Sequence, residues 1–359
     1  MSDAPHPAFG HPLPADAGRG PRRRTLAPLA GRGPRRRTLA PLAGRGWREA
    51  PGEGPAVSVV MGVYNGAATL RATLESILAQ EDVDFELIVV DDGSTDETPD
   101  ILREYPRVRV IRQENAGLTK ALIAGCAAAR GRYIARHDTG DFSHPKRLIL
   151  QKQALDEDET LAFVSCWTEY VGPEGEHLYT SRGTGVGKQA IDIIDTNQQH
   201  GVIDGPTAHG AVMFRRDAYE KAGGYRAAFY FGQDWDLWYR LAEVGRFRMI
   251  EEVLFTVMIE PATISSASRE AQMACARLSH EALLARRRGG DDAEVIARAA
   301  NIKRPATKGR CGAAKGWYFI GEALRRNRDR RARRYLRRAI AECPLMAKAW
   351  LRYLQALLT

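Results

Sequence analysis

Short apolar runs alternate with stretches of helical periodicity between residues 57 and 166, and this alternation constrains the fold more than any other feature. The first run, VSVVMGV at 57–63, is continuous and rich in β-branched residues, which is typical of a strand buried on both faces. Further runs of this kind lie at 86–90, 108–111, 132–136 and 161–166. Helices are expected between them, at 67–80, at 118–129 and after Pro145. The pattern predicts an α/β fold with a doubly wound, mostly parallel sheet.

After residue 166 the chain no longer alternates between expected strands and helices. The stretch 172–210 is irregular and rich in Gly and polar residues, which suggests loops over a site, and 234–245 predicts an amphipathic helix. After about residue 270 only helical periodicity remains, with amphipathic helices expected at 315–327, 330–343 and 346–358. We therefore expect an α/β domain at 56–268 and an all-helical C-terminal extension at 269–359.

The first 50 residues are rich in Pro, Gly and Arg, and GRGPRRRTLAPLA occurs twice in them, at 18–30 and 31–43. Such a segment cannot bury enough apolar surface to offset its loss of conformational entropy. We expect residues 1–50 to be disordered.

Charge is distributed unevenly along the chain. The net charge is +9, yet residues 1–50 carry ten Arg against three acids, and residues 301–359 carry sixteen Lys or Arg against three acids. A basic end suits nucleic acid, anionic lipid or an acidic glycan, and it is equally typical of a solvated helical face.

Cysteine spacing and hydropathy indicate the cellular compartment in which the protein is expected. The five cysteines are scattered, without a CxxC pair, which predicts reduced thiols rather than disulfides or a zinc site. No apolar run of about 18 residues and no apolar leader is visible, so we expect a cytoplasmic protein without a membrane span.

Polar clusters follow three of the expected strands: Tyr64-Asn65, Asp91-Asp92 and His137-Asp138-Thr139-Gly140-Asp141. Ligands bind outside the carboxyl ends of strands in an open parallel sheet, so these clusters should converge on one site. Neither a Gly-x-Gly-x-x-Gly sequence after the first strand nor a Walker A loop is present. Carboxylates that hold Mg²⁺ or Mn²⁺ commonly bridge it to phosphate oxygens, which points to a nucleotide diphosphate bound through metal.

Six segments carry a family resemblance by their order: VSVVMGVYNG, FELIVVDDGSTDET, ENAGLTKAL, GRYIARHDTGDFSHPKRL, HGAVMFRR and GQDWDLWYRL. Together, over roughly residues 56–265, they resemble family 2 glycosyltransferases, the large inverting group with a GT-A fold. The resemblance implies that the donor nucleotide is bound by Val63, Tyr64, Asn65, Asp92, Lys120 and Asp138. Tyr64 would stack on the base and Asp92 would accept a hydrogen bond from it. A helix cap is the plainer role for Asp92.

The resemblance also implies a divalent metal, Mn²⁺ or Mg²⁺, at an Asp-x-Asp motif whose last Asp falls here on Gly140. Asp138 matches the first Asp, Asp141 matches an acid that often follows, and Glu260 stands where many members carry a metal-binding His. We expect Asp138, Asp141 and Glu260 to share a weakened metal site, unless Asp141 only caps the turn before Pro145.

Basic side chains offer an alternative to a metal ion for neutralising the diphosphate. Arg136, Lys120 and Arg147 are candidates to neutralise the diphosphate directly, although Arg147 also suits a structural ion pair.

Asp234 matches the general base of the family. An inverting transfer is a single displacement at the anomeric carbon, so the acceptor hydroxyl must lose its proton as it attacks. Gln233, Trp235 and His209 are expected on the acceptor side. Helix capping by Asp234 and a purely structural His209 are the competing interpretations.

The resemblance implies sugar transfer from a nucleotide-diphosphate sugar, with a UDP-sugar as the first candidate, to a glycan or lipid-linked acceptor in surface polysaccharide synthesis. The alternatives are an inactive transferase-like adaptor and a sugar nucleotidyltransferase. The last helices loosely resemble a tetratricopeptide pair at Trp317-Tyr318, Ala323-Leu324, Ala339 and Pro344. A single pair cannot bury its own face, so it should pack on the catalytic domain or on another chain. Its basic residues predict peripheral contact with an anionic membrane, and no nucleic acid is expected.

Overall fold

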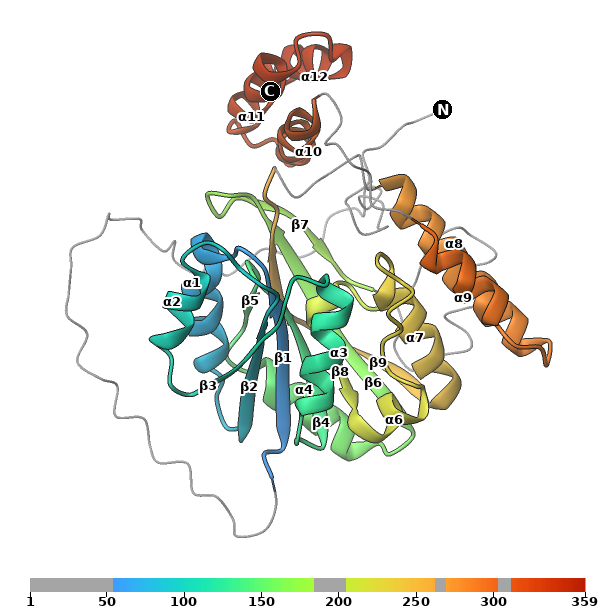
Figure 1. Ribbon diagram of the computed structural model, residues 1–359. Coiled ribbons are helices and arrows are strands. Elements are labelled where there is room, and N and C mark those ends of the chain that lie inside the picture. Colours follow the sequence, from blue (N-terminus) through green and yellow to red (C-terminus); the bar gives the residue numbers. More distant parts are fainter. Residues whose placement is uncertain (1–53, 184–204, 262–268, 303–310, 359) are drawn as a thin grey trace.

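The computed structural model describes residues 54–183, 205–261, 269–302 and 311–358 (Figure 1). The expected disordered segment and its duplication therefore lie outside the described residues. The strands are β1 (Val57–Val63), β2 (Phe85–Asp91), β3 (Val108–Arg112), β4 (Tyr133–Asp138), β5 (Phe142–Ser143), β6 (Leu161–Val171), β7 (His177–Ser181), β8 (Met213–Arg215) and β9 (Arg246–Met258). They form one sheet in the order β3-β2-β1-β4-β8-β6-β9-β5, with β7 paired to β6.

The helices enclose this sheet and then extend beyond it. They are α1 (Ala67–Leu78), α2 (Thr98–Arg103), α3 (Leu118–Ala128), α4 (Arg147–Glu157), α6 (Arg216–Lys221), α7 (Gln233–Val244), α8 (Arg269–Arg287), α9 (Ala293–Ala300), α10 (Gly312–Arg326), α11 (Ala332–Glu342) and α12 (Ala347–Leu357), with a 3₁₀ turn η1 (His209–Ala211). The α/β fold with a helical C-terminal extension is thus confirmed.

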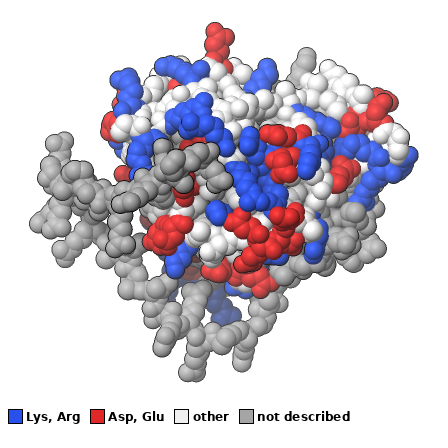
Figure 2. All heavy atoms as spheres, turned by 90° about the horizontal axis from the view of Figure 1, so that it is seen from below, with Lys and Arg blue, Asp and Glu red and all other residues white. Residues whose placement is uncertain are grey.

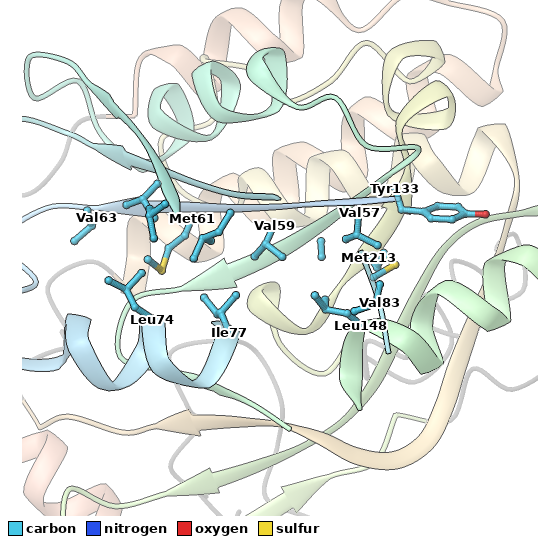
Figure 3. Close-up of a cluster of buried hydrophobic side chains, with 14 of the residues drawn as sticks. Val57, Val59, Met61, Val63, Leu74, Ile77, Val83, Tyr133, Leu148 and Met213 are labelled. Atoms are coloured by element: carbon cyan, nitrogen blue, oxygen red, sulfur yellow. The ribbon is translucent and has the colours of Figure 1, made fainter. Parts of the chain in front are cut away.

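Strand β1 lies at the centre of the parallel half of the sheet. It pairs in parallel with β2 and β4, and β2 pairs in parallel with β3. Alternate side chains of β1 point to opposite faces, as the pleat requires. Val57, Val59 and Met61 pack toward α1 and α4, where Figure 3 shows Leu74, Ile77 and Leu148. The other face packs on α3, α6 and α7, so the sheet is covered on both sides.

Beyond β4 the sheet is mixed rather than mostly parallel. Strand β8 runs antiparallel to both β4 and β6, whereas β6 and β9 are parallel. The short β7 lies within the stretch that we expected to be irregular, and β9 follows α7 as a long strand that the sequence analysis did not predict. The antiparallel β8 brings η1, which precedes it in the chain, beside the carboxyl end of β4, where Arg136 N donates to Val212 O (2.8 Å).

The C-terminal helices α10 and α11 pack back on the sheet, which is one of the two arrangements expected. Phe319, Ile320 and Leu336 share a buried cluster with Tyr170 of β6 and Phe255 of β9. Figure 1 shows these helices, in red, above the end of the sheet to which β9 runs. The helical extension is therefore part of the same packed body as the sheet.

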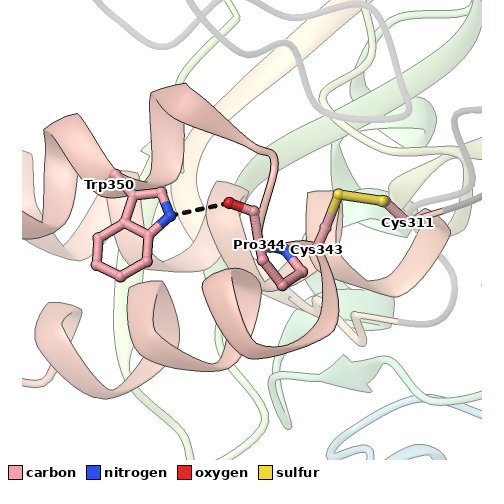
Figure 4. The surroundings of a disulfide bond; sticks show 4 residues. All are labelled: Cys311, Cys343, Pro344 and Trp350. Atoms are coloured by element: carbon pink, nitrogen blue, oxygen red, sulfur yellow. Dashed lines mark hydrogen bonds between the residues drawn. A yellow bond between two sulfur atoms is a disulfide. The ribbon is translucent and has the colours of Figure 1, made fainter.

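A disulfide joins Cys311 to Cys343, which corrects the expectation of five reduced thiols (Figure 4). Helices α10 and α11 form an antiparallel hairpin, so the residue before α10 and the residue after α11 meet at the same end. A sequence separation of 32 residues gives no sign of this proximity. Cys126, Cys166 and Cys275 are free and buried.

The face at the amino ends of the parallel strands carries both signs of charge. Figure 2 shows blue and red side chains interspersed there, and Arg130 pairs with Glu86 while Arg248 pairs with Asp158. Basic residues on this face are thus largely matched by acids. In the described ranges, no helix combines the length and the hydropathy needed to span a bilayer.

Candidate active site

The loops after β1, β2 and β4 meet at the carboxyl edge of the sheet. In the register of the parallel strands, Val63 lies opposite Asp91 and Gly62 lies opposite Asp138. The three polar clusters predicted from the sequence are therefore brought together at one edge.

Asn65 fixes the loop after β1 to the loop after β2. Its backbone N–H donates to Ser94 Oγ (2.9 Å), and its Oδ1 accepts from the backbone N–H of Thr95 (2.8 Å). The residue has a left-handed backbone (φ 50°), which Asn tolerates better than most residues. Tyr64, just before it, is 52% exposed. Its ring is therefore available to a ligand at this edge.

Asp92 organises the loop that leads into α3. Its buried carboxylate accepts from Gln113 Nε2 (2.6 Å) and from the backbone N–H groups of Ala116 (2.9 Å) and Gly117 (2.8 Å). It does not cap α2, because the N-cap residue of that helix is Glu97 and the Asp92 carboxylate bonds to the loop at 113–117. The carboxylate thus holds in place the loop between β3 and α3.

One aromatic residue, Tyr230, and one basic residue, Lys120, border this loop. A Cβ at Gly117 would lie 2.8 Å from Tyr230 Cε2, so the Tyr230 ring covers the backbone there. Lys120, one turn into α3, is exposed. Gln113 and Tyr230 belong to no motif that the sequence analysis identified.

Asp138 at the end of β4 is paired with Arg136 two residues before it. The Asp138 side chain is 31% exposed, whereas the Arg136 side chain is buried. Arg136 also lies 3.5 Å from His209 Nδ1, and its Nε and Nη1 have no hydrogen-bond partner among the described residues. The buried guanidinium forms an ion pair with the partly exposed Asp138 carboxylate and contributes positive charge to the site.

Gly140 occupies a turn that favours glycine. Its φ is +97°, and its N–H donates to Thr73 Oγ1 (2.9 Å) on α1. A Cβ there would meet only Thr69 Oγ1, at 3.6 Å, so conformation rather than space selects glycine.

Asp141 is buried beside Asp138. Burial, and next the charge of Asp138, raises the pKa of Asp141 well above its ordinary value, while a hydrogen bond from the backbone of Met258 opposes this. The Met258 contact ties the turn to the end of β9, two residues before Glu260. No group of three or more His, Cys, Asp or Glu side chains within the described ranges is arranged to hold a metal ion.

Arg147 is a structural residue in this fold. It is fully buried, and it donates to the carbonyl oxygens of Arg136 (2.7 Å) and Gly210 (2.9 Å) and to Ser143 Oγ (3.0 Å). These bonds tie α4 to β4 and η1. These partners all lie inside the protein, so the arginine joins the elements around the site.

Asp234 is the second residue of α7, and Gly232, two residues before it, occupies the N-cap position with φ 65°. Asp234 is therefore not the N-cap residue of α7, although its carboxylate bonds to the backbone of the first turn. Its side chain is buried, and its Oδ1 accepts from the backbone N–H of Trp235 (3.0 Å). Burial and, to a smaller extent, the charge of Asp138 raise the pKa of Asp234 to about 6, although the hydrogen bond from Trp235 N–H and the charge of Arg136 act to lower it. Asp138, Arg136 and Asp234 therefore act on one another electrostatically although they are distant in sequence.

His209 is buried between Arg136 and Tyr225. Its Nε2 lies 2.8 Å from Tyr225 Oη, and its ring meets Trp238 edge-on at 6.3 Å. Burial, and next the charge of Arg136, lowers the pKa of His209 well below its ordinary value, so the ring is neutral near pH 7. Tyr225 is a site neighbour that the sequence analysis missed.

Gln233 and Trp235 flank Asp234 on α7. Gln233 is buried, and Trp235 is half-buried with its ring edge-on to Trp238 at 4.7 Å. The tryptophan pair supports the first turn of the helix and leaves part of Trp235 exposed.

The chain is similar in sequence to known glycosyltransferases. A model of the glycosyl transferase family 2 matches residues 58–223. EpsE of Bacillus subtilis (strain 168), named as a glycosyltransferase, is 34% identical over 221 residues, which cover 57% of this chain and 73% of EpsE. The chondroitin synthase of Pasteurella multocida (strain Pm70) is 28% identical over 205 residues, which cover 56% of this chain and only 20% of the synthase.

Among solved structures, a mannosyltransferase from Pyrobaculum calidifontis, in complex with GDP-Man and Mn²⁺, superposes with a TM-score of 0.49 at 20% identity, covering 88% of this chain and 84% of that one. The EpsE match spans most of that relative, and the family model matches the segment that holds β1 to β8. The chain therefore belongs to glycosyltransferase family 2 and is a glycosyltransferase.

Proposed function

We propose that the chain is an inverting glycosyltransferase with Asp234 as its general base. The single observation that supports this most strongly is a buried carboxylate in the first turn of α7, with a pKa of about 6, in the electrostatic field of Asp138 at the sheet edge. A base with this pKa is ionised at neutral pH and still holds a proton well enough to accept one.

The proposed reaction is one displacement. Asp234 takes the proton of an acceptor hydroxyl as the hydroxyl oxygen attacks the anomeric carbon. The bond from that carbon to the diphosphate oxygen breaks, and its electron pair leaves with the nucleoside diphosphate. The configuration at the anomeric carbon inverts because attack and departure occur on opposite faces.

The donor that we propose is a nucleotide-diphosphate sugar, with UDP as the first candidate nucleotide. Support comes from the exposed Tyr64 ring at the end of β1 and from the Asp92 carboxylate, which positions the loop at 113–117 beside it. Lys120 is exposed at the start of α3, where a phosphate would benefit from both its charge and the helix N-terminus.

A divalent cation, Mn²⁺ or Mg²⁺, is proposed at Asp138 and Asp141. Two adjacent carboxylates, one of them buried, repel each other, and a cation between them would remove that repulsion. The bound cation would stabilise the charge that develops on the leaving diphosphate. Glu260, which was expected as a third ligand, does not form a three-carboxylate group with Asp138 and Asp141 in the described part of the chain. Arg136, which is already paired with Asp138, supports this site from below.

We propose a glycan or a lipid-linked saccharide as acceptor, with His209, Gln233 and Trp235 on the acceptor side and surface polysaccharide synthesis as the setting. His209 would act there by positioning Tyr225 and Arg136 rather than by direct contact, because it is buried. We further propose a cytoplasmic enzyme that binds anionic membrane surfaces peripherally through its basic C-terminal helices.

The test is Asp234→Asn, compared with Asp236→Asn on the same helix. Asp236 is equally buried but is paired with Arg240. Asp234→Asn should lower turnover by about 100-fold or more while UDP binding, measured by calorimetry, is retained. Asp236→Asn should lower thermal stability with a much smaller loss of turnover per folded molecule. Turnover within a few-fold of wild type in Asp234→Asn would assign the base elsewhere, and wild type without transfer or hydrolysis of any nucleotide sugar would favour a non-catalytic adaptor.

A further inference from the structure

The outward face of α12 is apolar along its whole length. Leu345 just before the helix is 96% exposed and Leu358 at its end is 89% exposed. Between them, four large side chains are about half exposed: Trp350, Leu351, Leu354 and Leu357. Positions 350, 351, 354, 357 and 358 recur at the spacing of one helix face, and Ala349 and Ala356 form the buried inner face. We refer to Leu345, Trp350, Leu351, Leu354, Leu357 and Leu358 as the α12 stripe.

The α12 stripe has no exposed acid to interrupt it. The sequence from Cys343 to Leu358 contains neither Asp nor Glu. The indole N–H of Trp350 donates to Pro344 O (2.9 Å; Figure 4), so its polar group is satisfied within the chain. The stripe itself is therefore apolar, and an occupant need not supply a hydrogen bond to it.

The helical extension that carries the stripe is strongly basic. Residues 311–358 contain twelve Lys or Arg and three acids. The acids have partners inside the extension: Glu322 pairs with Arg325 and Arg326, Asp329 pairs with Arg331, and Glu342 accepts from Trp317 Nε1 (2.7 Å). Arg337 of the adjacent α11 is exposed, and Arg333 donates to the backbone of Ala356 at the end of α12 (2.9 Å).

The helices that carry the stripe are held against the sheet near the candidate site. Asn327 donates to Leu178 O (2.6 Å), and Arg334 and Tyr335 both donate to the buried Glu176. A Cβ on Gly316 would lie 2.3 Å from Pro261 O, just past the end of β9. Figure 1 shows α10 to α12 above the end of the sheet toward which β1 and β9 run. A surface that binds the stripe would therefore lie on the same side as the candidate site.

We propose that α12 lies flat in the surface of an anionic lipid bilayer, with the α12 stripe among the acyl chains and the arginines of α11 at the headgroups. An apolar face bordered by basic residues, with a tryptophan on it, fits this location. A second copy of the chain would cover the same face only by bringing two strongly basic extensions together, which is unfavourable. The inference rests on the proposed function, which has the basic C-terminal helices bind an anionic membrane, and it assigns that binding to α12; the bilayer would hold a lipid-linked acceptor beside the site.

The test uses the full chain and sedimentation with two kinds of vesicle, phosphatidylcholine alone and phosphatidylcholine mixed with phosphatidylglycerol. We expect binding to the mixed vesicles that weakens as salt is added. Replacing Leu351 and Leu354 together by Ser should lower the partition coefficient by about tenfold or more, because both side chains would leave the acyl region. The matched control is Val110→Ser, which removes an exposed apolar side chain from β3. It should bind like wild type.

Two further measurements keep the result interpretable. Bromine-labelled acyl chains should quench the fluorescence of wild type more than that of Trp350→Phe, and this comparison holds even if the double Ser variant folds poorly. Asp234→Asn should bind vesicles like wild type, so failure of the catalytic proposal is distinguishable from failure of this one. Equal binding to both vesicle types, or quenching that does not depend on Trp350, would overturn the proposal. Self-association abolished by the double Ser variant, without vesicle binding, would instead assign the stripe to a second copy.

Discussion

At the scale of single residues, Asp234 shows how the site balances stability against chemistry. Its carboxylate is buried at the start of α7, and burial favours the neutral form of an acid. The proposed reaction needs the ionised form. The pH dependence of activity and that of stability should therefore respond to the same group in opposite directions.

The first prediction concerns activity. Because the pKa of Asp234 is raised to about 6, kcat/KM should rise with pH and reach half of its plateau near pH 6. Initial rates at subsaturating acceptor, measured across this range in buffers of constant ionic strength, provide the profile. A profile that is flat down to pH 5 would contradict the assignment of Asp234 as the group that must lose its proton.

The second prediction concerns stability. The native pKa of Asp234 lies above its ordinary value of 3.8, so the stabilisation by the neutral carboxyl is complete below pH 3.8 and is lost as the pH rises through about 6. Asn keeps the neutral form at every pH. Asp234→Asn should therefore raise the free energy of unfolding by about 1–3 kcal/mol at pH 8 and by much less at pH 4.

Urea unfolding at both pH values checks this, with Asp236→Asn as control. Asp236 pairs with Arg240, so that variant should lose stability at pH 8 rather than gain it. Equal stability of Asp234→Asn and wild type at pH 8 would mean that the native carboxylate bears no desolvation cost.

The third prediction concerns Gly140, where the family motif has an acid. Because φ is +97°, any side chain there is strained, and both Gly140→Asp and Gly140→Ala should lose about 1–2 kcal/mol of stability. Only Gly140→Asp adds a ligand atom beside Asp138. Calorimetric titration with Mn²⁺ should give tighter binding to the Asp variant than to the Ala variant. Equal affinity would show that position 140 is directed away from the cation.

At the scale of elements, the sequence indicates those strands whose side chains are buried on both faces. The run 57–63 is uninterrupted, and β1 has the same bounds. Strand β9 was not predicted because Glu251 and Glu252 are exposed at its middle. Its register with β6 shifts there, between Cys166 and Trp167 of β6. A strand with a bulge and a charged pair matches neither a continuous apolar run nor a strict alternation.

The same reasoning explains which site residues could be predicted. Asp92, Asp138 and Asp234 follow strand ends or begin a helix, so their positions relative to the sheet are implied by local pattern. Gln113 and Tyr225 reach the site through tertiary contacts with Asp92 and His209, and no local pattern distinguishes them from other polar residues. Arg147 illustrates the reverse case, because its charge suggested phosphate binding and its contacts are internal.

The fourth prediction belongs to the α10–α11 hairpin. The disulfide between Cys311 and Cys343 closes a loop with a sequence separation of 32 residues, and the chain-entropy estimate for such a loop is about 3–4 kcal/mol. Cys343→Ser should lower the melting temperature in the absence of reductant. With reductant present, wild type and Cys343→Ser should melt alike. A wild type that loses no stability on reduction, with full thiol alkylation confirmed by mass, would contradict a stabilising bond.

At the scale of the whole molecule, the helical extension and the sheet share one apolar cluster. Phe319, Ile320 and Leu336 cover Tyr170 and Phe255, so the domain boundary expected at residue 268 does not separate two independent cores. The family model ends at residue 223, well before the residues that complete this cluster.

The fifth prediction follows from that sharing. A chain ending at residue 302 should be less stable than the full chain and prone to aggregate, because the cluster at Tyr170 and Phe255 would be exposed. Phe319→Ala should reproduce part of the loss, about 3–5 kcal/mol, as expected for removal of a buried aromatic ring. Thermal unfolding and light scattering give the comparison. An unchanged melting temperature on truncation would contradict a shared core.

The shared cluster also sets an order of events during synthesis on the ribosome. Tyr170 is made early, yet the side chains that cover it arrive only with Phe319 to Leu336. At the usual speed of translation, the interval between them lasts roughly 10–30 s, which is long compared with the folding of a small domain. During that interval the end of the sheet stays uncovered, so the nascent chain should be a client of chaperones until α11 emerges.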